Sequence, residues 1–286
     1  MKPNINDAAL SSSWHRIIAR GYAAYAKQDP ELCFAALPDI FDTLFSDLEL
    51  GKPAAQQTAA TTLRALLVKC VPKSHKTQDP AVMSRLVKSL AGGLGYRFKP
   101  VWAVVLLLIA VAFNSLGKQA RPALDPLLEL VSSLRMEPDF ELKAEADATL
   151  GAAVSAIGPE VFLSVLPLNI DAVTGKDKNA VGRAWLLPLM KDYIEHAPLG
   201  YFTDTLLPTA DLLSKHRDEF KAKRRTVESR VFGALNQQVW ALFSGFCDAP
   251  LDVTVKFSSD FAARLGSEIH ESPELRSYIC TGIQRL

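Results

Sequence analysis

Residues that signal catalysis or metal binding are few in this sequence, and their spacing suits neither role. The chain of 286 residues has five scattered histidines and four cysteines that lie far apart, without a CxxC pair. No histidine stands four residues from another, and no cysteine has a histidine at zinc-finger spacing. Glycine-rich phosphate loops and the zinc-protease, serine-hydrolase and calcium-loop motifs are also missing. We therefore expect no enzyme, cofactor or metal ion, and reduced, mostly buried thiols at Cys33, Cys70, Cys247 and Cys280.

Apolar runs long enough to cross a membrane are missing as well. The most apolar run, Val101–Phe113, has thirteen residues, whereas a transmembrane helix needs about 20. The amino terminus also lacks the apolar core of a signal peptide. We expect Val101–Phe113 to form a buried core helix, and the protein to have neither a membrane nor a small-molecule substrate as a partner.

The chain as a whole is almost neutral, but two of its segments carry a strong excess of one charge. The net charge is +1, which by itself points to no partner. Residues 51–121 nevertheless carry eleven Lys and Arg against the single acid Asp79, and residues 122–171 carry two bases against nine acids. Such asymmetry can mark a segment that faces a polyanion, and the alternative is a solvated helix surface with no partner.

Strand patterns are scarce, whereas helix patterns recur along the whole chain. There is no sustained two-residue alternation and no Asn-Gly or Asp-Gly hairpin turn. Apolar residues instead recur at three- and four-residue spacing, as from Leu124 to Leu134. Proline marks first turns, because its missing N–H would be unpaired there anyway. Helix starts are expected at Pro30, Pro80, Pro122, Pro138, Pro159 and Pro273.

These segments predict an all-α fold, a HEAT/armadillo-like solenoid of antiparallel helix pairs. Two helices recur about every 40–47 residues, which is the HEAT/armadillo period. We expect a single continuous α-solenoid over residues 1–286, of about six to seven helix pairs, with an internal polar loop at 170–180. A compact helical bundle is the alternative, although so many short helices would need a very large core. The charged stretch Lys215–Arg230 is expected to begin a long helix that runs through Phe246.

Two stretches carry a more specific pattern than helical period. They are Leu150–Ile170, LGAAVSAIGPEVFLSVLPLNI, and Gly182–Pro208, GRAWLLPLMKDYIEHAPLGYFTDTLLP. Together with Tyr96–Glu145 they resemble the ribosomal RNA-processing protein 12 family, large HEAT-repeat proteins of the eukaryotic nucleolus. The resemblance covers residues 77–283.

The resemblance implies a non-catalytic scaffold in ribosome biogenesis, located in the nucleus and nucleolus and shuttling to the cytoplasm. Its partners would be pre-rRNA and small-subunit pre-ribosome assembly factors, with Ran GTPase and nucleoporins during pre-ribosome export. Family members are several times longer, so we expect this chain to be part of a larger repeat protein. The family has no catalytic motif to carry over to these residues.

The basic block and the Lys215–Arg230 stretch supply the candidate RNA contacts. Lysine and arginine on a helical-repeat surface would neutralise phosphates and make binding sensitive to salt. The alternative is a karyopherin-like nuclear transport receptor or a general protein-binding solenoid, whose contacts would be apolar grooves between helices. The predicted RNA-binding residues are Lys69, Lys73, Lys76, Arg85, Lys88, Arg97, Lys99, Lys221, Lys223, Arg224 and Arg225.

Overall fold

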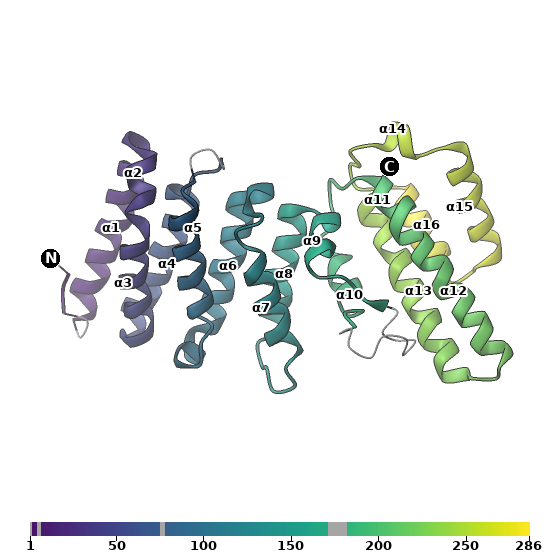
Figure 1. Ribbon diagram of the computed structural model, residues 1–286, viewed down its shortest axis with the longest axis horizontal. Helices are drawn as coiled ribbons and strands as arrows, with labels where there is room; N and C mark the ends of the chain where they lie inside the picture. The colour runs from purple at the N-terminus through teal and green to yellow at the C-terminus, as the bar shows by residue number, and fades with distance from the viewer. Residues whose placement is uncertain (1, 5–6, 75–77, 171–181) are drawn as a thin grey trace. The chain divides into compact units, whose positions relative to one another are not determined.

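The computed structural model describes residues 2–4, 7–74, 78–170 and 182–286, in two compact units. We call Met1–Ile157 the amino-terminal unit and Gly158–Leu286 the carboxy-terminal unit. The described residues form helices and no strand, which confirms the all-α prediction (Figure 1). A single solenoid over 1–286 stays a prediction, and residues 171–180 of the predicted polar loop lie outside the described residues.

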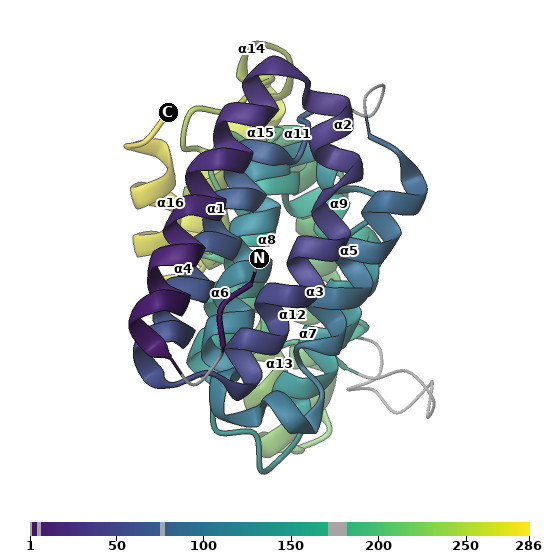
Figure 2. The same cartoon turned by 90° about the vertical axis from the view of Figure 1, so that its left-hand side faces the viewer.

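The amino-terminal unit is a two-layer stack of helices of the HEAT type. One layer holds α1, α4, α6 and α8, each packed on the next, and the other holds α3, α5 and α7 (Figure 2). The pairs α3/α4, α5/α6 and α7/α8 join the layers. Its elements are α1 (Ala8–Gln28), α2 (Pro30–Ala35), α3 (Leu37–Leu50), α4 (Pro53–Cys70), α5 (Pro80–Gly92), the 3-10 helix η2 (Tyr96–Val101), α6 (Trp102–Leu116), the 3-10 helix η3 (Gly117–Ala120), α7 (Asp125–Met136) and α8 (Lys143–Ile157).

The apolar helix predicted at Val101–Phe113 corresponds to α6, which packs on both α4 and α8. Of the described residues, one stretch, Tyr96–Ala120, is long and apolar enough to cross a membrane, and 56% of its most apolar window is buried. Leu107, which is 55% exposed, marks the side of α6 that faces solvent. The hydrophobicity of this helix therefore serves the interior of the unit.

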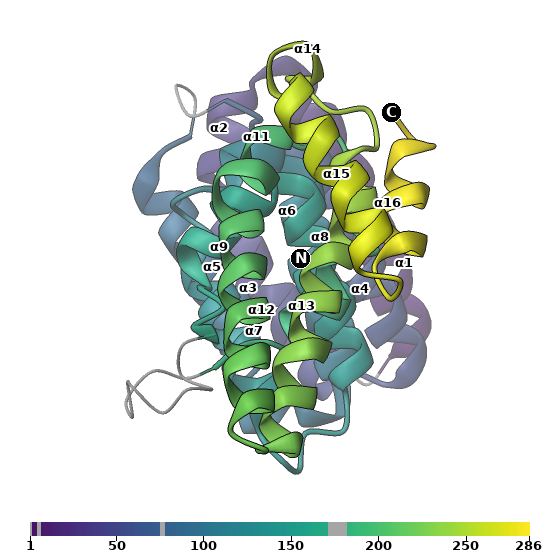
Figure 3. The ribbon, with the colours of Figure 1, turned by 90° about the vertical axis from the view of Figure 1, so that its right-hand side faces the viewer.

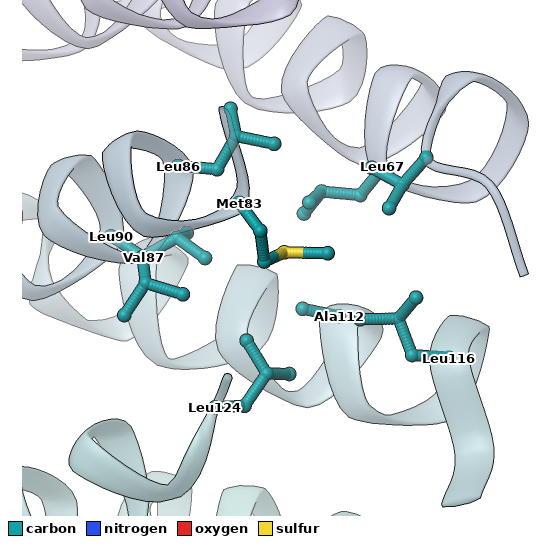
Figure 4. Close-up of a pocket in the computed structure, with 9 residues that line it drawn as sticks. Leu67, Met83, Leu86, Val87, Leu90, Ala112, Leu116 and Leu124 are labelled. Atoms are coloured by element: carbon teal, nitrogen blue, oxygen red, sulfur yellow. The ribbon is translucent and has the colours of Figure 1, made fainter. Parts of the chain in front are cut away.

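The core between the two layers is closely packed. The Met83 side chain of α5 lies among Leu67 of α4, Leu116 of α6 and Leu124, which precedes α7 (Figure 4). The space left among these side chains is about 10 Å³, barely enough for one water molecule. This cavity is a packing detail rather than a ligand site.

A buried polar cluster joins three helices of the amino-terminal unit. The His15 Nε2 of α1 lies 3.0 Å from an Asp47 carboxylate oxygen of α3, and its Nδ1 lies 2.9 Å from the Thr58 hydroxyl of α4. The Lys2 ammonium reaches the other Asp47 oxygen at 2.6 Å, and the Thr62 hydroxyl donates to the His15 carbonyl. His15 is fully buried and Asp47 is 1% exposed, so these polar groups depend on one another for hydrogen bonds.

The carboxy-terminal unit is built around an antiparallel hairpin of two long helices. α12 and α13 pack along each other, α16 and α10 pack on α13, and α15 contacts α16 (Figure 3). Phe202, Trp240, Phe243 and Phe246 form an aromatic cluster in its core. The elements are α9 (Pro159–Val165), α10 (Leu186–Met190), α11 (Leu199–Tyr201), the π-helix η5 (Phe202–Leu206), α12 (Leu207–Ala222), α13 (Thr226–Phe246), α14 (Val253–Lys256), α15 (Ser259–Glu271) and α16 (Arg276–Ile283).

Two glycines in this unit lead to opposite expectations. A Cβ on Gly282 of α16 would overlap the buried Phe243 ring, 2.6 Å from its Cε1, whereas a Cβ on Gly266 of α15 would meet nothing within 4 Å. We expect Gly282→Ala to lower the free energy of unfolding by about 1–3 kcal/mol, because the packed ring has to move. Gly266→Ala is the matched control and should raise it by about 0.5–1 kcal/mol through helix propensity. Urea unfolding of both variants measures the signs, and a stabilised Gly282→Ala would contradict this packing.

Three of the six predicted helix starts are wrong by a few residues. Pro30, Pro80 and Pro159 begin α2, α5 and α9, as predicted. The other three prolines are followed by a turn that places an apolar side chain in the core before the helix begins. The helices expected at Pro122, Pro138 and Pro273 start at Asp125, Lys143 and Arg276, and the buried side chains that intervene are Leu124, Phe140 and Leu275.

The cysteines and tryptophans mostly serve packing. Cys33, Cys70 and Cys247 are buried free thiols, and Cys280 is exposed. Burial raises the pKa of Cys70 and of Cys247 to about 12, so the reactive thiolate is disfavoured at both positions. Trp240 is buried in the aromatic cluster, and the other three tryptophans are half-buried.

Candidate nucleic-acid interface

The predicted basic residues of the amino-terminal unit do not form one patch. Two of them, Lys69 and Lys73, are exposed at the turn between α4 and α5, and Lys76 lies outside the described residues. Because α5 has 13 residues, about 20 Å of helix separates this turn from the other end of α5. The remaining four bases lie along α5 or in η2, beyond that other end: Arg85, Lys88, Arg97 and Lys99.

Three of these bases line a groove between α3 and the α5–η2 segment. The groove encloses about 500 Å³ and has one acidic wall and one basic wall. Two aromatic rings also line it, Phe45 and Phe98, which pack edge to face with centres 6.0 Å apart. The basic wall carries Arg85, Lys88 and Arg97, and the acidic wall of α3 carries Asp42 and Glu49.

Most of the basic charge in this groove is already matched by acids. Arg85 lies 2.8 Å from the Asp39 carboxylate, and Arg97 lies 3.8 Å from that of Glu49. Lys88 and Lys99, in contrast, have no carboxylate of the described residues within ion-pair distance. These two lysines are therefore freer than the two arginines to contact a phosphate.

The stretch expected to continue as one helix from Lys215 through Phe246 is broken, so that prediction is wrong. α12 ends at Ala222 and α13 begins at Thr226. Arg224 takes a left-handed conformation with φ +58°, and the Arg225 and Arg224 N–H groups donate to the carbonyls of Phe220 and Lys221. This is the Schellman pattern that ends helices, here with arginine where glycine is usual.

We call the five bases around this turn the hairpin tip, because they surround the end of the α12–α13 hairpin. They are Lys221, Lys223, Arg224, Arg225 and Arg230. Arg230 was not among the predicted contacts, and it joins the tip only because the chain reverses at the turn. It lines the same groove as Lys221, one residue on each helix.

Arg225 is held in place by the hairpin itself. Its Nε donates to a Glu228 carboxylate oxygen at 2.8 Å, and its guanidinium lies 4.8 Å from the centre of the Phe220 ring. Phe220 in turn stacks on Phe232 of α13, with ring centres 5.3 Å apart. The pKa of the Glu228 carboxyl is lowered, first by a hydrogen bond from its own backbone N–H and then by Arg225. Arg225 thus closes the turn and is the least available of the five bases for a ligand.

The other four bases of the hairpin tip are exposed, and no carboxylate of the described residues lies within ion-pair distance of them. Two of the four line a groove of about 530 Å³ that also contains Arg217. Arg217 differs from them, because its guanidinium is paired with Asp218 and Glu274. Free and clustered bases of this kind are what phosphate binding requires.

The described residues hold no arrangement of side chains that is typical of a metal centre. Within their ranges, no group of three or more His, Cys, Asp or Glu could hold a metal ion. The buried His15–Asp47 pair, which sequence reasoning missed, lies inside the helix stack rather than in an open cleft. The signal in the sequence is Asp47, which lies between the apolar Phe45 and Leu48. An aspartate on such an apolar helix face requires a buried partner.

Comparison with known proteins shows which family the chain is similar to. The family model "Ribosomal RNA-processing protein 12, HEAT repeats" matches residues 50–286, which agrees with the predicted fold class. The RRP12-like proteins of Gallus gallus and Homo sapiens are 34% and 32% identical to this chain, over 99% of it and 22% of their own length. Ribosomal RNA-processing protein 12 of Saccharomyces cerevisiae is 28% identical over 100% of this chain and 24% of its own length. The match is wider than the predicted 77–283, and the chain spans less than a quarter of each of these relatives.

Proposed function

The chain belongs to the ribosomal RNA-processing protein 12 family, and from that premise we propose that it is a non-catalytic scaffold of ribosome biogenesis. Its ligands would be pre-rRNA and the assembly factors of small-subunit precursors, in the nucleus and nucleolus. HEAT-type stacks offer long surfaces of exposed helices, which suits holding partners rather than catalysis. We include passage to the cytoplasm during export, with Ran GTPase and nucleoporins as further partners, in the same proposal.

The observation that supports RNA as a direct ligand is the hairpin tip. Four exposed bases around one turn, with no carboxylate of the described residues within ion-pair distance of them, concentrate positive charge on a chain whose net charge is only +1. Such clusters recognise the shape of folded RNA and its phosphates without reading base sequence. Lys88 and Lys99, and Lys69 and Lys73 at the α4–α5 turn, would add weaker contacts in the amino-terminal unit.

RNA binding by this chain should be steeply dependent on salt. If the four free bases of the hairpin tip each reach a phosphate, the logarithm of the association constant should fall with that of salt concentration with a slope of about −3. Fluorescence anisotropy with a labelled pre-rRNA fragment, between about 50 and 200 mM KCl, measures the slope. An affinity for RNA that does not change with salt would contradict phosphate contacts.

The alternative of a karyopherin-like or general protein-binding solenoid makes the opposite prediction. Its partners would fill grooves between helices, and association would persist as salt rises. Under this alternative, the groove between α3 and the α5–η2 segment would be the candidate site for a protein partner, although ion pairs from Arg85 and Arg97 already cross it. Absence of RNA binding together with salt-resistant capture of a purified assembly factor would favour this second function.

A further inference from the structure

An exposed aromatic side chain stands in the turn between α5 and α6. Tyr96, the first residue of η2, is 84% exposed, more than any other large apolar side chain in the described ranges. It has no ring contact there, and its hydroxyl has no hydrogen-bond partner in those ranges. Packing therefore gives no reason for an aromatic residue at this position.

The turn that carries Tyr96 is fixed by three hydrogen bonds around one glycine. The Gly95 N–H donates to the Gly92 carbonyl, and the Gly95 carbonyl accepts from the Phe98 N–H and from the Trp102 indole N–H at 3.1 Å. Phe98 is 2% exposed, and the Trp102 ring packs against the core with its centre 5.9 Å from that of the buried Phe140 ring. Tyr96 is thus presented by an anchored turn and not by a frayed end.

Two exposed basic side chains, Arg97 and Lys99, follow Tyr96 in the turn. Arg97 is 70% exposed along its side chain, and Lys99 is exposed without a carboxylate of the described residues within ion-pair distance. The only acid that reaches this turn among the described residues is Glu49, 3.8 Å from Arg97. Residues 91–101 contain no acid at all. The turn therefore presents an aromatic face beside two positive charges, the combination that binds single-stranded nucleic acid.

We propose that Tyr96 stacks on an unpaired nucleobase while Lys99 contacts the adjoining phosphate, so that the η2 turn binds single-stranded RNA. The inference rests on the proposed function, because it assumes that RNA reaches this surface. Tyrosine stacks on any base, so the turn would distinguish single strands from duplexes without reading sequence. A paired base inside a helix has its faces covered by its neighbours and offers no such surface.

The test compares an oligouridylate of about 12 nucleotides with a duplex of the same length. We expect Tyr96→Ala to weaken oligouridylate binding roughly 10-fold, within the range for loss of one stacked base. The salt slope and the affinity for the duplex should stay unchanged, because stacking involves no counterion release. Tyr96→Trp should retain binding, and its added indole fluorescence should be quenched by oligouridylate. Tyr25→Ala, a partly exposed tyrosine of α1, is the matched control and should bind as the unmodified chain does.

The outcomes separate this inference from the proposed function. Thermal unfolding of Tyr96→Ala should match that of the unmodified chain, since the side chain has no packing partner among the described residues. If the unmodified chain binds RNA and Tyr96→Ala binds oligouridylate equally well, the stacking role is overturned and the proposed function stands. Equal weakening for oligouridylate and duplex overturns it too. If the unmodified chain binds neither RNA, both proposals fail.

Discussion

Replacing His15 by alanine is expected to lower the free energy of unfolding by about 3–5 kcal/mol, the range for removing a partner of a buried charge. His15 and Asp47 are almost completely inaccessible, and their side chains lie 3.0 Å apart between α1 and α3. Without the imidazole, the Asp47 carboxylate keeps only Lys2 among the described residues, and the Thr58 hydroxyl loses its bond to the ring. The variant also leaves a cavity where the ring was.

The control for this change is His270→Ala. His270 is exposed in the last turn of α15, so its replacement should alter stability by no more than about 0.5 kcal/mol. Urea unfolding followed by circular dichroism measures both variants. Asp47→Asn keeps the volume but removes the charge, and it should fall between the two. A His15→Ala variant as stable as His270→Ala would show that the cluster does not hold the three helices together.

Sequence reasoning located the helices well because helical period and proline placement are local properties. The predicted apolar run lies in α6, except for Val101, the last residue of η2. Helix starts failed where a buried side chain competed with the proline signal, as at Phe140. The break at Arg224 was missed for a related reason, because arginine rarely takes the left-handed conformation that ends α12.

The sequence predicted which segments of the candidate interface are rich in bases, but not how those bases are arranged and paired. Counting bases in residues 51–121 found a positively charged segment, but it could not show that Arg85 and Arg97 meet acids of α3. Those acids lie more than forty residues away in sequence, and only the stacking of α3 on α5 and η2 brings them together. The same limit hid Arg230 and the exposure of Tyr96. Long-range pairing, rather than local pattern, decides which bases remain free for a ligand.

The second large effect is expected from replacing the free bases of the hairpin tip. A triple variant, Lys221→Glu, Lys223→Glu and Arg230→Glu, should weaken binding of a pre-rRNA fragment on the order of 100-fold, if each base contributes about 1 kcal/mol at a polyanion surface. The magnitude of the salt slope should fall by about 2. Arg224 is left unchanged in this variant because its backbone has φ +58°, and Arg225 because it closes the turn.

A second triple variant controls for net charge. Arg16, Arg20 and Lys27 are exposed on α1, and no carboxylate of the described residues lies within ion-pair distance of them. Changing these three to glutamate alters the net charge by the same amount but should leave RNA affinity within about threefold, because screening weakens charges that do not touch the ligand. Equal losses in both variants would mean that bulk charge, not the hairpin tip, drives binding.

Arg224→Gly separates folding from binding, because glycine suits the left-handed turn and should stabilise the hairpin while RNA affinity still falls. If Arg224 contacts a phosphate, the Arg224→Gly variant must be more stable than the unmodified chain and must also bind RNA more weakly.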